Sequence, residues 1–259
     1  MSHVDLLQLE FTTDSGIGRR ARLGLVVLES DHTLEAEFRM LDVEGVVHYV
    51  SRIANDATIT PDSLTAMEER LPVAAALLPV ELQLDAIGYG CTSAATLIGE
   101  HGVREALTSA HPGVPCSNPI SAAAAAFEAL GVRRISVLTP YTADVTNRIV
   151  EHFESLGLEV VAVGSFLEPD DHVVARITEE VVAAGAASVG EVAGCEAVFV
   201  SCTSLRTFGV VSTIENRLDK PVVSSNLALA WHLLRLAGID DKLPGMGRLF
   251  TLGIDRGGG

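Results

Sequence analysis

Two stretches of the sequence, AIGYGCTSAATLIG at residues 86–99 and AVFVSCTSLRTFGV at residues 197–210, decide the expected fold. Each has the pattern of a buried strand that ends in Cys-Thr-Ser and continues into a helix. A given tripeptide seldom recurs by chance at equivalent points of two strand–helix units. The match therefore predicts two homologous, pseudo-symmetric lobes.

Along the rest of the chain, short β-branched runs alternate with helical patterns, which is typical of a parallel sheet flanked by helices. The helix ends carry the expected signals, such as Asn118 and Pro119 before an alanine-rich helix and Gly131 after it. We expect an α/β fold with strands at residues 22–28, 84–90, 134–139, 158–163, 197–201 and 221–224. The predicted first lobe is 1–118 plus 227–259, and the second is 119–226.

The charge balance limits the classes of partner. The 259 residues include 34 Asp and Glu but only 18 Lys and Arg, which gives a formal net charge of −16. A field of this sign repels phosphate backbones and anionic lipid headgroups. No window approaches the run of about 20 apolar residues that spans a bilayer, and the first residues carry acids where a signal peptide carries Lys or Arg. We expect a cytoplasmic protein without nucleic-acid or membrane partners.

The four cysteines, Cys91, Cys116, Cys195 and Cys202, are too sparse for a disulfide framework and are expected to be free thiols. An isolated cysteine at a strand end is more often a small buried hydrophobe. Cys91 and Cys202, however, share the repeated motif at the sheet edge where open α/β proteins bind ligands, and a helix N-terminus there lowers a cysteine pKa. The duplicated context favours a function for this pair.

Thr92 and Ser93 follow the first cysteine, and Thr203 and Ser204 follow the second. These residues can cap helices, whose free N–H groups bind carboxylates. Two thiols on opposite sides of a small carboxylate suit proton transfer at the adjacent carbon, because one thiolate removes the α-proton and the other thiol returns one to the opposite face. Such a reaction needs no metal or organic cofactor, and neither motif has a further Cys or His at metal-ligand spacing.

Six stretches together carry a resemblance to a known superfamily, within the span from about Arg22 to Phe250. They are LGLVVLESDHTLEAEF, GYGCTSA, VLTPYTADVTNR, SFLEPDDHVVARI, VFVSCTSLR and KPVVSSNLALAWHLLRLAGI. On these residues the chain resembles the Asp/Glu racemase superfamily, which includes aspartate, glutamate and hydantoin racemases, maleate cis-trans isomerase and arylmalonate decarboxylase. The resemblance is strongest to the ectoine-utilisation branch, often called EutA.

The resemblance implies an active site in the cleft between the two lobes, with Cys91 and Cys202 matching the two catalytic cysteines of the superfamily. It also matches Tyr141 to an active-site tyrosine whose hydroxyl donates to a substrate carboxylate. Arylmalonate decarboxylases keep only the second cysteine, so the presence of both favours racemisation or isomerisation over decarboxylation. Superfamily members are commonly dimers, and a homodimer is therefore expected.

Two aspartates depart from the maleate isomerase pattern. Asp31 stands where those enzymes have a binding asparagine, and Asp171, next to Asp170, aligns with a second one. Like-charge repulsion makes an aspartate unfavourable beside a dicarboxylate, so maleate is a poor match. A substrate with one carboxylate and a cationic or N–H-rich group, such as an amino acid or an ectoine-like amidine, suits the pair. Either aspartate can also cap the helix that follows it.

These features favour a cofactor-independent, two-cysteine racemase or isomerase that acts next to the carboxylate of a small amino-acid-like or ectoine-like substrate. Maleate cis-trans isomerisation and arylmalonate-type decarboxylation stay open as alternatives. A further alternative is a non-enzymatic, small-molecule-binding regulatory module of ectoine utilisation. The stretch around His48 and Arg52 is expected to form a surface loop or a lid.

Overall fold

Two parallel sheets with the same strand order organise the molecule, as seen in the computed structural model, which describes residues 6–56 and 61–254. The first sheet has the order β2-β1-β3-β4 and the second the order β6-β5-β7-β8, so one order repeats the other. The strands are β1 (Ala21–Leu28), β2 (Val46–Ile53), β3 (Ala86–Gly90), β4 (Cys116–Ser117), β5 (Arg134–Thr139), β6 (Glu159–Ser165), β7 (Ala197–Val200) and β8 (Val222–Ser224). The prediction of two parallel sheets flanked by helices is confirmed.

The helices are α1 (Leu34–Phe38), α2 (Pro61–Ala75), α3 (Thr92–Ala110), α4 (Pro119–Leu130), α5 (Ala143–Ser155), α6 (Asp171–Val174), α7 (Glu179–Gly190), α8 (Val211–Leu218) and α9 (Ser225–Leu236). The predicted ends of α4 are confirmed. The Asn118 side chain accepts hydrogen bonds from the N–H groups of Ile120 and Ser121, and Gly131 ends the helix with a φ of 68°. A positive φ is readily adopted only by glycine, which explains its place there.

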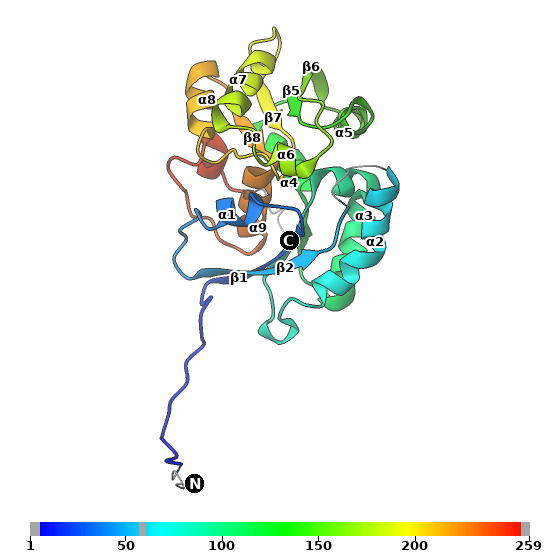
Figure 1. Ribbon diagram of the computed structural model, residues 1–259. Helices are drawn as coiled ribbons and strands as arrows, with labels where there is room; N and C mark the ends of the chain where they lie inside the picture. Colours follow the sequence, from blue (N-terminus) through cyan, green and yellow to red (C-terminus); the bar gives the residue numbers. More distant parts are fainter. Residues whose placement is uncertain (1–5, 57–60, 255–259) are drawn as a thin grey trace.

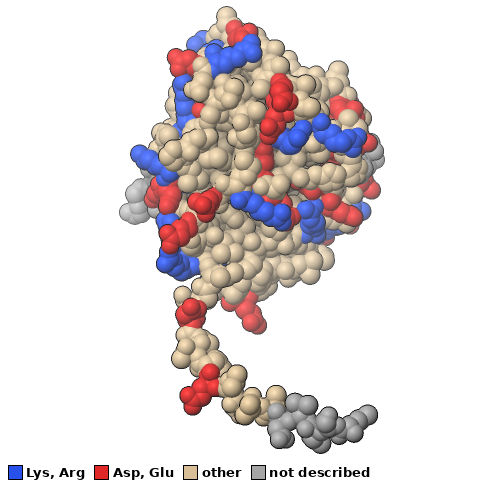
Figure 2. Space-filling model, turned by 60° about the vertical axis from the view of Figure 1, so that its left-hand side comes forward, with Lys and Arg blue, Asp and Glu red and all other residues tan. Residues whose placement is uncertain are grey.

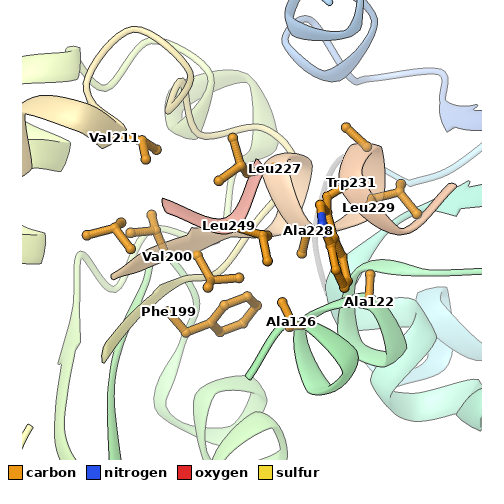
Figure 3. Close-up of a cluster of buried hydrophobic side chains, with 14 of the residues drawn as sticks. Ala122, Ala126, Phe199, Val200, Val211, Leu227, Ala228, Leu229, Trp231 and Leu249 are labelled. Atoms are coloured by element: carbon orange, nitrogen blue, oxygen red, sulfur yellow. The ribbon is translucent and has the colours of Figure 1, made fainter. Parts of the chain in front are cut away.

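Helix α9 joins the two halves of the molecule. Its sequence SNLALAWHLLRL is apolar on nearly every side, the pattern of a helix buried all round. It contacts β1 and β3 of the first sheet, β8 of the second sheet and helix α4 (Figure 1). Figure 3 shows Trp231 of α9 beside Ala122 of α4, and Phe199 of β7 beside Ala126 of the same helix α4. The hydrophobic core is therefore continuous across both sheets, and the lobe boundaries at 118/119 and 226/227 stay a prediction.

The stretch around His48 and Arg52 is a regular edge strand, β2, and the prediction of a loop there is wrong. It pairs in parallel with β1. His48 packs against the edge of Phe38, with ring centroids 5.4 Å apart, and the Arg52 guanidinium donates to the carbonyl groups of Leu28 and Asp31 at 3.0 Å each. Polar side chains interrupt the apolar pattern of this strand, although its valines and Ile53 are typical of a β-strand.

Residues 6–14 run away from the body as an extended segment (Figure 1), whereas Arg19 and Arg20 form ion pairs with Glu44 and Asp241. On the face drawn in Figure 2, acidic and basic side chains of the described residues are interspersed. Among the described residues, no helix is both long and apolar enough to cross a membrane.

Candidate active site

The carboxyl ends of the central strands β3 and β7 meet at one cavity, which both Cys91 and Cys202 line. Six further residues predicted for the site also line it: Thr92, Ser93, Tyr141, Asp171, Thr203 and Ser204. Asp31 does not belong to the lining. The cavity volume is about 10 Å³, which corresponds to about one water molecule. The structure therefore brings the two motifs together in a closed arrangement.

The first motif has the predicted local structure, in which a buried strand leads through a cysteine into a helix. Cys91 is the N-cap of α3, and its Sγ accepts a hydrogen bond from the Ala94 N–H at 3.4 Å. The Ser93 hydroxyl lies 3.6 Å from the same sulfur. At Gly90, before it, an added Cβ would collide with the side chain of Leu34 of α1, which would have to shift. This close approach brings α1 against the end of β3.

The second motif differs, and the prediction that it runs straight into a helix is wrong. Helix α8 begins only at Val211, and residues 201–210 form turns. Cys202 itself has a φ of 121°, a value that residues other than glycine rarely adopt. Its Sγ accepts a hydrogen bond from the Ser204 N–H at 3.4 Å. The second sulfur is thus held by a strained turn rather than by a helix N-terminus.

The two threonines of the motifs, Thr92 and Thr203, make the contacts between them. Thr92 Oγ1 lies 2.8 Å from Ser225 Oγ, and the same serine oxygen accepts a hydrogen bond from the Cys202 N–H at 3.0 Å. Thr203 Oγ1 donates to the Gly90 carbonyl at 3.3 Å. Thr92 and Thr203 therefore join the two cysteine motifs.

Burial dominates the electrostatics of the thiols. It raises the pKa of Cys91 to about 11, although the Ala94 N–H acts in the opposite direction. Burial and the nearby Asp171 raise the pKa of Cys202 to about 12. The N-terminus of α3 acts in the predicted direction on Cys91, but desolvation outweighs it, so the pKa of the thiol is raised rather than lowered. The pKa of Tyr141 is also raised well above its ordinary value, by burial and by both sulfurs.

Asp171 is directed inward and Asp170 is the helix cap. The Asp170 side chain accepts from the N–H groups of His172 and Val173, at the start of α6. Asp171 is 3% exposed and accepts a hydrogen bond from Ser30 Oγ at 3.1 Å, and burial raises its pKa. The capping alternative for Asp171 is therefore wrong, and its carboxyl group lines the cavity beside the thiols.

Asp31 has a capping arrangement, and its second carboxyl oxygen has no partner. Oδ1 accepts from the N–H groups of Thr33 and Leu34 at 2.7 Å each. Oδ2 is buried without a hydrogen-bond partner in the described structure, and burial raises the pKa of Asp31 to about 6. Asp171 contributes to this rise. Two buried carboxyl groups thus influence one another at the site.

Sequence reasoning missed part of the lining. Leu28, Asn55, Asp56 and Met67 also border the cavity. They come from the end of β1, the segment after β2, and α2, so no shared motif marks them. No Lys or Arg is among the described lining residues, and the Arg206 guanidinium donates to the Ile177 carbonyl at 2.9 Å. Among the described residues, no group of His, Cys, Asp and Glu is arranged to hold a metal ion.

The repeated sheets and the paired thiols define an α/β enzyme of the Asp/Glu racemase-like fold. A family model described as arylmalonate decarboxylase matches residues 24–250, and the chain belongs to this family. The family, which includes maleate isomerases, uses cysteine-based catalysis.

Three relatives illustrate the similarity. The chain is 33% identical over 140 residues to the arylmalonate decarboxylase of Bordetella bronchiseptica, a match that covers 53% of this chain and 58% of that protein. It is 28% identical over 244 residues to the maleate isomerase of Nocardia farcinica, covering 88% of this chain and 94% of that protein. A solved structure of a Cys-to-Ser mutant of the Nocardia farcinica maleate isomerase, with a covalently bound succinylcysteine intermediate, superposes with a TM-score of 0.81 at 24% identity. That match covers 89% of this chain and 98% of the solved one.

Proposed function

We propose that the protein is a cofactor-independent racemase or isomerase that moves a proton at the carbon next to a carboxylate. The observation that carries the proposal is that Cys91 and Cys202, from the two copies of one motif, line a single cavity. One sulfur, as a thiolate, takes the α-proton and becomes a thiol. The other thiol gives its proton to the opposite face and becomes the thiolate, so the number of protons is unchanged.

The charges around the cavity support a substrate with a cationic or N–H-rich group. Asp31 and Asp171 are buried carboxyl groups, and no Lys or Arg is among the described lining residues. A second substrate carboxylate would be repelled by these groups when they are ionised, whereas an ammonium or amidinium group would be attracted. Amino acids and ectoine-like cyclic amidines have this charge pattern, as expected for the ectoine-utilisation branch.

A cationic substrate would also assist the chemistry. Both thiols are neutral at pH 7 in the closed site, since their pKa values lie at about 11 and 12. A nearby positive charge stabilises a thiolate and lowers the pKa of the thiol. The cavity volume of about 10 Å³ also means that the lining side chains must move apart before a substrate binds.

The test is deuterium exchange at the α-carbon in heavy water, followed by NMR. The panel contains amino acids, ectoine-like amidine carboxylates, an arylmalonate and maleate. Exchange with a zwitterionic or amidine substrate that is lost in Cys91→Ala and in Cys202→Ala supports the proposal. Absence of exchange with every such substrate would overturn it and favour the ligand-binding regulatory module.

Maleate isomerisation is the second candidate. It is favoured by the match to the Nocardia farcinica maleate isomerase, which covers 94% of the length of that protein. The covalently bound succinylcysteine in the structure of that enzyme's mutant is the adduct of a thiol with a butenedioate. In this chain, a cysteine thiolate would add to one alkene carbon while the other carbon gains a proton. Rotation about the resulting single bond, followed by loss of that proton and of the thiolate, would give fumarate. Conversion of maleate to fumarate without α-proton exchange in amino acids would put this candidate first.

Assembly and location are part of the same proposal. We propose a two-fold homodimer, the commonest closed symmetry for soluble enzymes, acting on a small carboxylate in the cytoplasm. Light scattering at micromolar concentration should report about twice the mass of one chain, and the mass of a single chain would overturn the dimer.

A further inference from the structure

Glu37 of α1 is a buried carboxylate outside the cavity lining. It is 5% exposed, and among the described residues the donors to its side chain belong to segments far away in the sequence. Oε1 accepts from the N–H groups of Thr207 and Phe208, the second at 2.8 Å. Oε2 accepts from the Asn226 side-chain amide at 2.7 Å and from Thr207 Oγ1 at 3.3 Å. One carboxylate thus ties α1 to the turn after β7 and to the start of α9.

The turn that Glu37 holds is the one that carries Cys202. Asn226 Nδ2 donates both to Glu37 Oε2 and, at 2.9 Å, to the carbonyl of Thr203, the residue after Cys202. Glu37 therefore holds the turn directly through its bonds to Thr207 and Phe208. It also holds Thr203 indirectly, through Asn226. A non-glycine residue with a φ of 121°, such as Cys202, persists only where surrounding contacts enforce the conformation. These contacts do so from both ends of the turn.

A carboxylate is unfavourable at this buried position unless its two hydrogen-bond acceptors are needed there. Burial raises the pKa of Glu37 to about 7, even though backbone and side-chain donors act in the opposite direction. No Lys or Arg forms an ion pair with it among the described residues. An apolar side chain would avoid the desolvation penalty but could not accept hydrogen bonds from two successive backbone N–H groups and an amide.

We propose that Glu37 is a positioning residue that, through Asn226 and the turn at residues 202–208, holds the Cys202 thiol toward Cys91. The inference rests on the proposed function in that Cys202 is taken as one of the two proton-transfer groups. Glu37 does not line the cavity and is not assigned a contact with substrate.

The test compares Glu37→Gln with Glu35→Gln, a matched control on the same helix. Glu35 forms ion pairs with Arg39 and Arg52 at the surface. In Glu37→Gln, the amide keeps one oxygen as an acceptor, but its NH2 group is placed against either the N–H groups of Thr207 and Phe208 or the Asn226 amide. Amide hydrogen exchange at Thr207 and Phe208 should be at least about 10-fold faster than in wild type, because the turn opens more often. Iodoacetamide should also alkylate Cys202 faster relative to Cys91. The control should change neither measurement.

The kinetic readout depends on the proposed function and is therefore separate. Misplacing a proton-transfer group lowers kcat, by roughly 10²-fold for a displacement near 1 Å, while KM should change much less. If wild type shows no activity, the proposed function fails, but hydrogen exchange and alkylation still decide the positioning role. Unchanged exchange and alkylation in a folded Glu37→Gln would overturn it. If that variant does not fold, the same two measurements are made on Asn226→Ala, which removes the link to Thr203. Unchanged hydrogen exchange and alkylation there would likewise overturn the positioning role.

Discussion

The hydroxyl oxygen of Ser225 lies 3.0 Å from the backbone nitrogen of Cys202 and accepts its hydrogen bond. The same oxygen is 2.8 Å from Thr92 Oγ1, next to Cys91 in the sequence. One serine at the start of α9 therefore connects both cysteine motifs. Because Cys202 has a positive φ, this bond helps to hold a conformation that the backbone does not adopt on its own.

Ser225→Ala should lower the free energy of unfolding by about 1–3 kcal/mol, because the buried Cys202 N–H loses its partner. Urea denaturation measures the change. Ser188→Ala is the matched control, since the Ser188 hydroxyl is exposed and donates to the Ala184 carbonyl within α7. An equal decrease in the free energy of unfolding in both variants would show that the hydrogen bond from Cys202 to Ser225 adds no stability beyond that of an exposed serine.

Cys91→Ala and Cys202→Ala should each reduce inversion or isomerisation of the substrate by roughly 10³-fold or more, because water replaces a positioned proton-transfer group poorly. Cys116→Ala and Cys195→Ala should be nearly silent. The thiols of those two residues donate to the carbonyls of Val114 and Ala197 and lie outside the cavity lining. The measurement is the rate of substrate inversion or isomerisation in each of the four variants. Full activity in Cys91→Ala or in Cys202→Ala would contradict the two-base mechanism.

Alkylation should report the raised thiol pKa values. With a pKa of about 11, the thiolate fraction of Cys91 at pH 7 is about 10⁻⁴, and that of Cys202 is lower still. Between pH 7 and pH 10, labelling of both by iodoacetamide should rise about tenfold for each pH unit, since the reagent attacks the thiolate. Peptide mass spectrometry gives the rates separately. A fast labelling rate that stays constant from pH 7 upward would contradict the raised pKa values of the two thiols.

The repeated Cys-Thr-Ser motif was sufficient to predict two parallel sheets and the meeting of the two cysteines. It could not show that the second copy ends in a turn, because the same three residues follow a helical path after β3 and a strained one after β7. Tertiary contacts with α1 and α9 decide that difference. Glu37 was not found for the same reason, since it lies 170 residues from Thr207 in the sequence and no local pattern joins them.

Asp31→Asn should stabilise the protein at pH 7 and have little effect near pH 4. Burial raises the pKa of Asp31 from 3.8 to about 6, so the folded state binds this proton more tightly than the unfolded state does. The protonated form therefore supports stability below pH 3.8, and this contribution is lost as the pH rises through about 6. The full effect corresponds to about 3 kcal/mol. Urea denaturation at the two pH values checks it, and an equal effect at both would contradict the assignment.

Substrate charge gives the last prediction, which separates the amidine-like substrate from maleate. Ionised Asp31 and Asp171 repel a second carboxylate and attract an ammonium or amidinium group, and a charge-assisted contact contributes about 1.5–3 kcal/mol, or roughly 10- to 100-fold. Wild type should therefore exchange the α-proton of a zwitterionic or amidine carboxylate and leave maleate essentially unchanged at pH 8. Asp31→Asn and Asp171→Asn should each narrow that gap, because both carboxyl groups are buried beside the site. Asp170→Asn should not, because Asp170 is exposed and caps α6. Maleate isomerisation is measured from the change in absorbance as fumarate forms. Rapid fumarate formation by wild type at pH 8 would show that the two aspartates do not exclude dicarboxylates, and maleate isomerisation would then be the function to pursue.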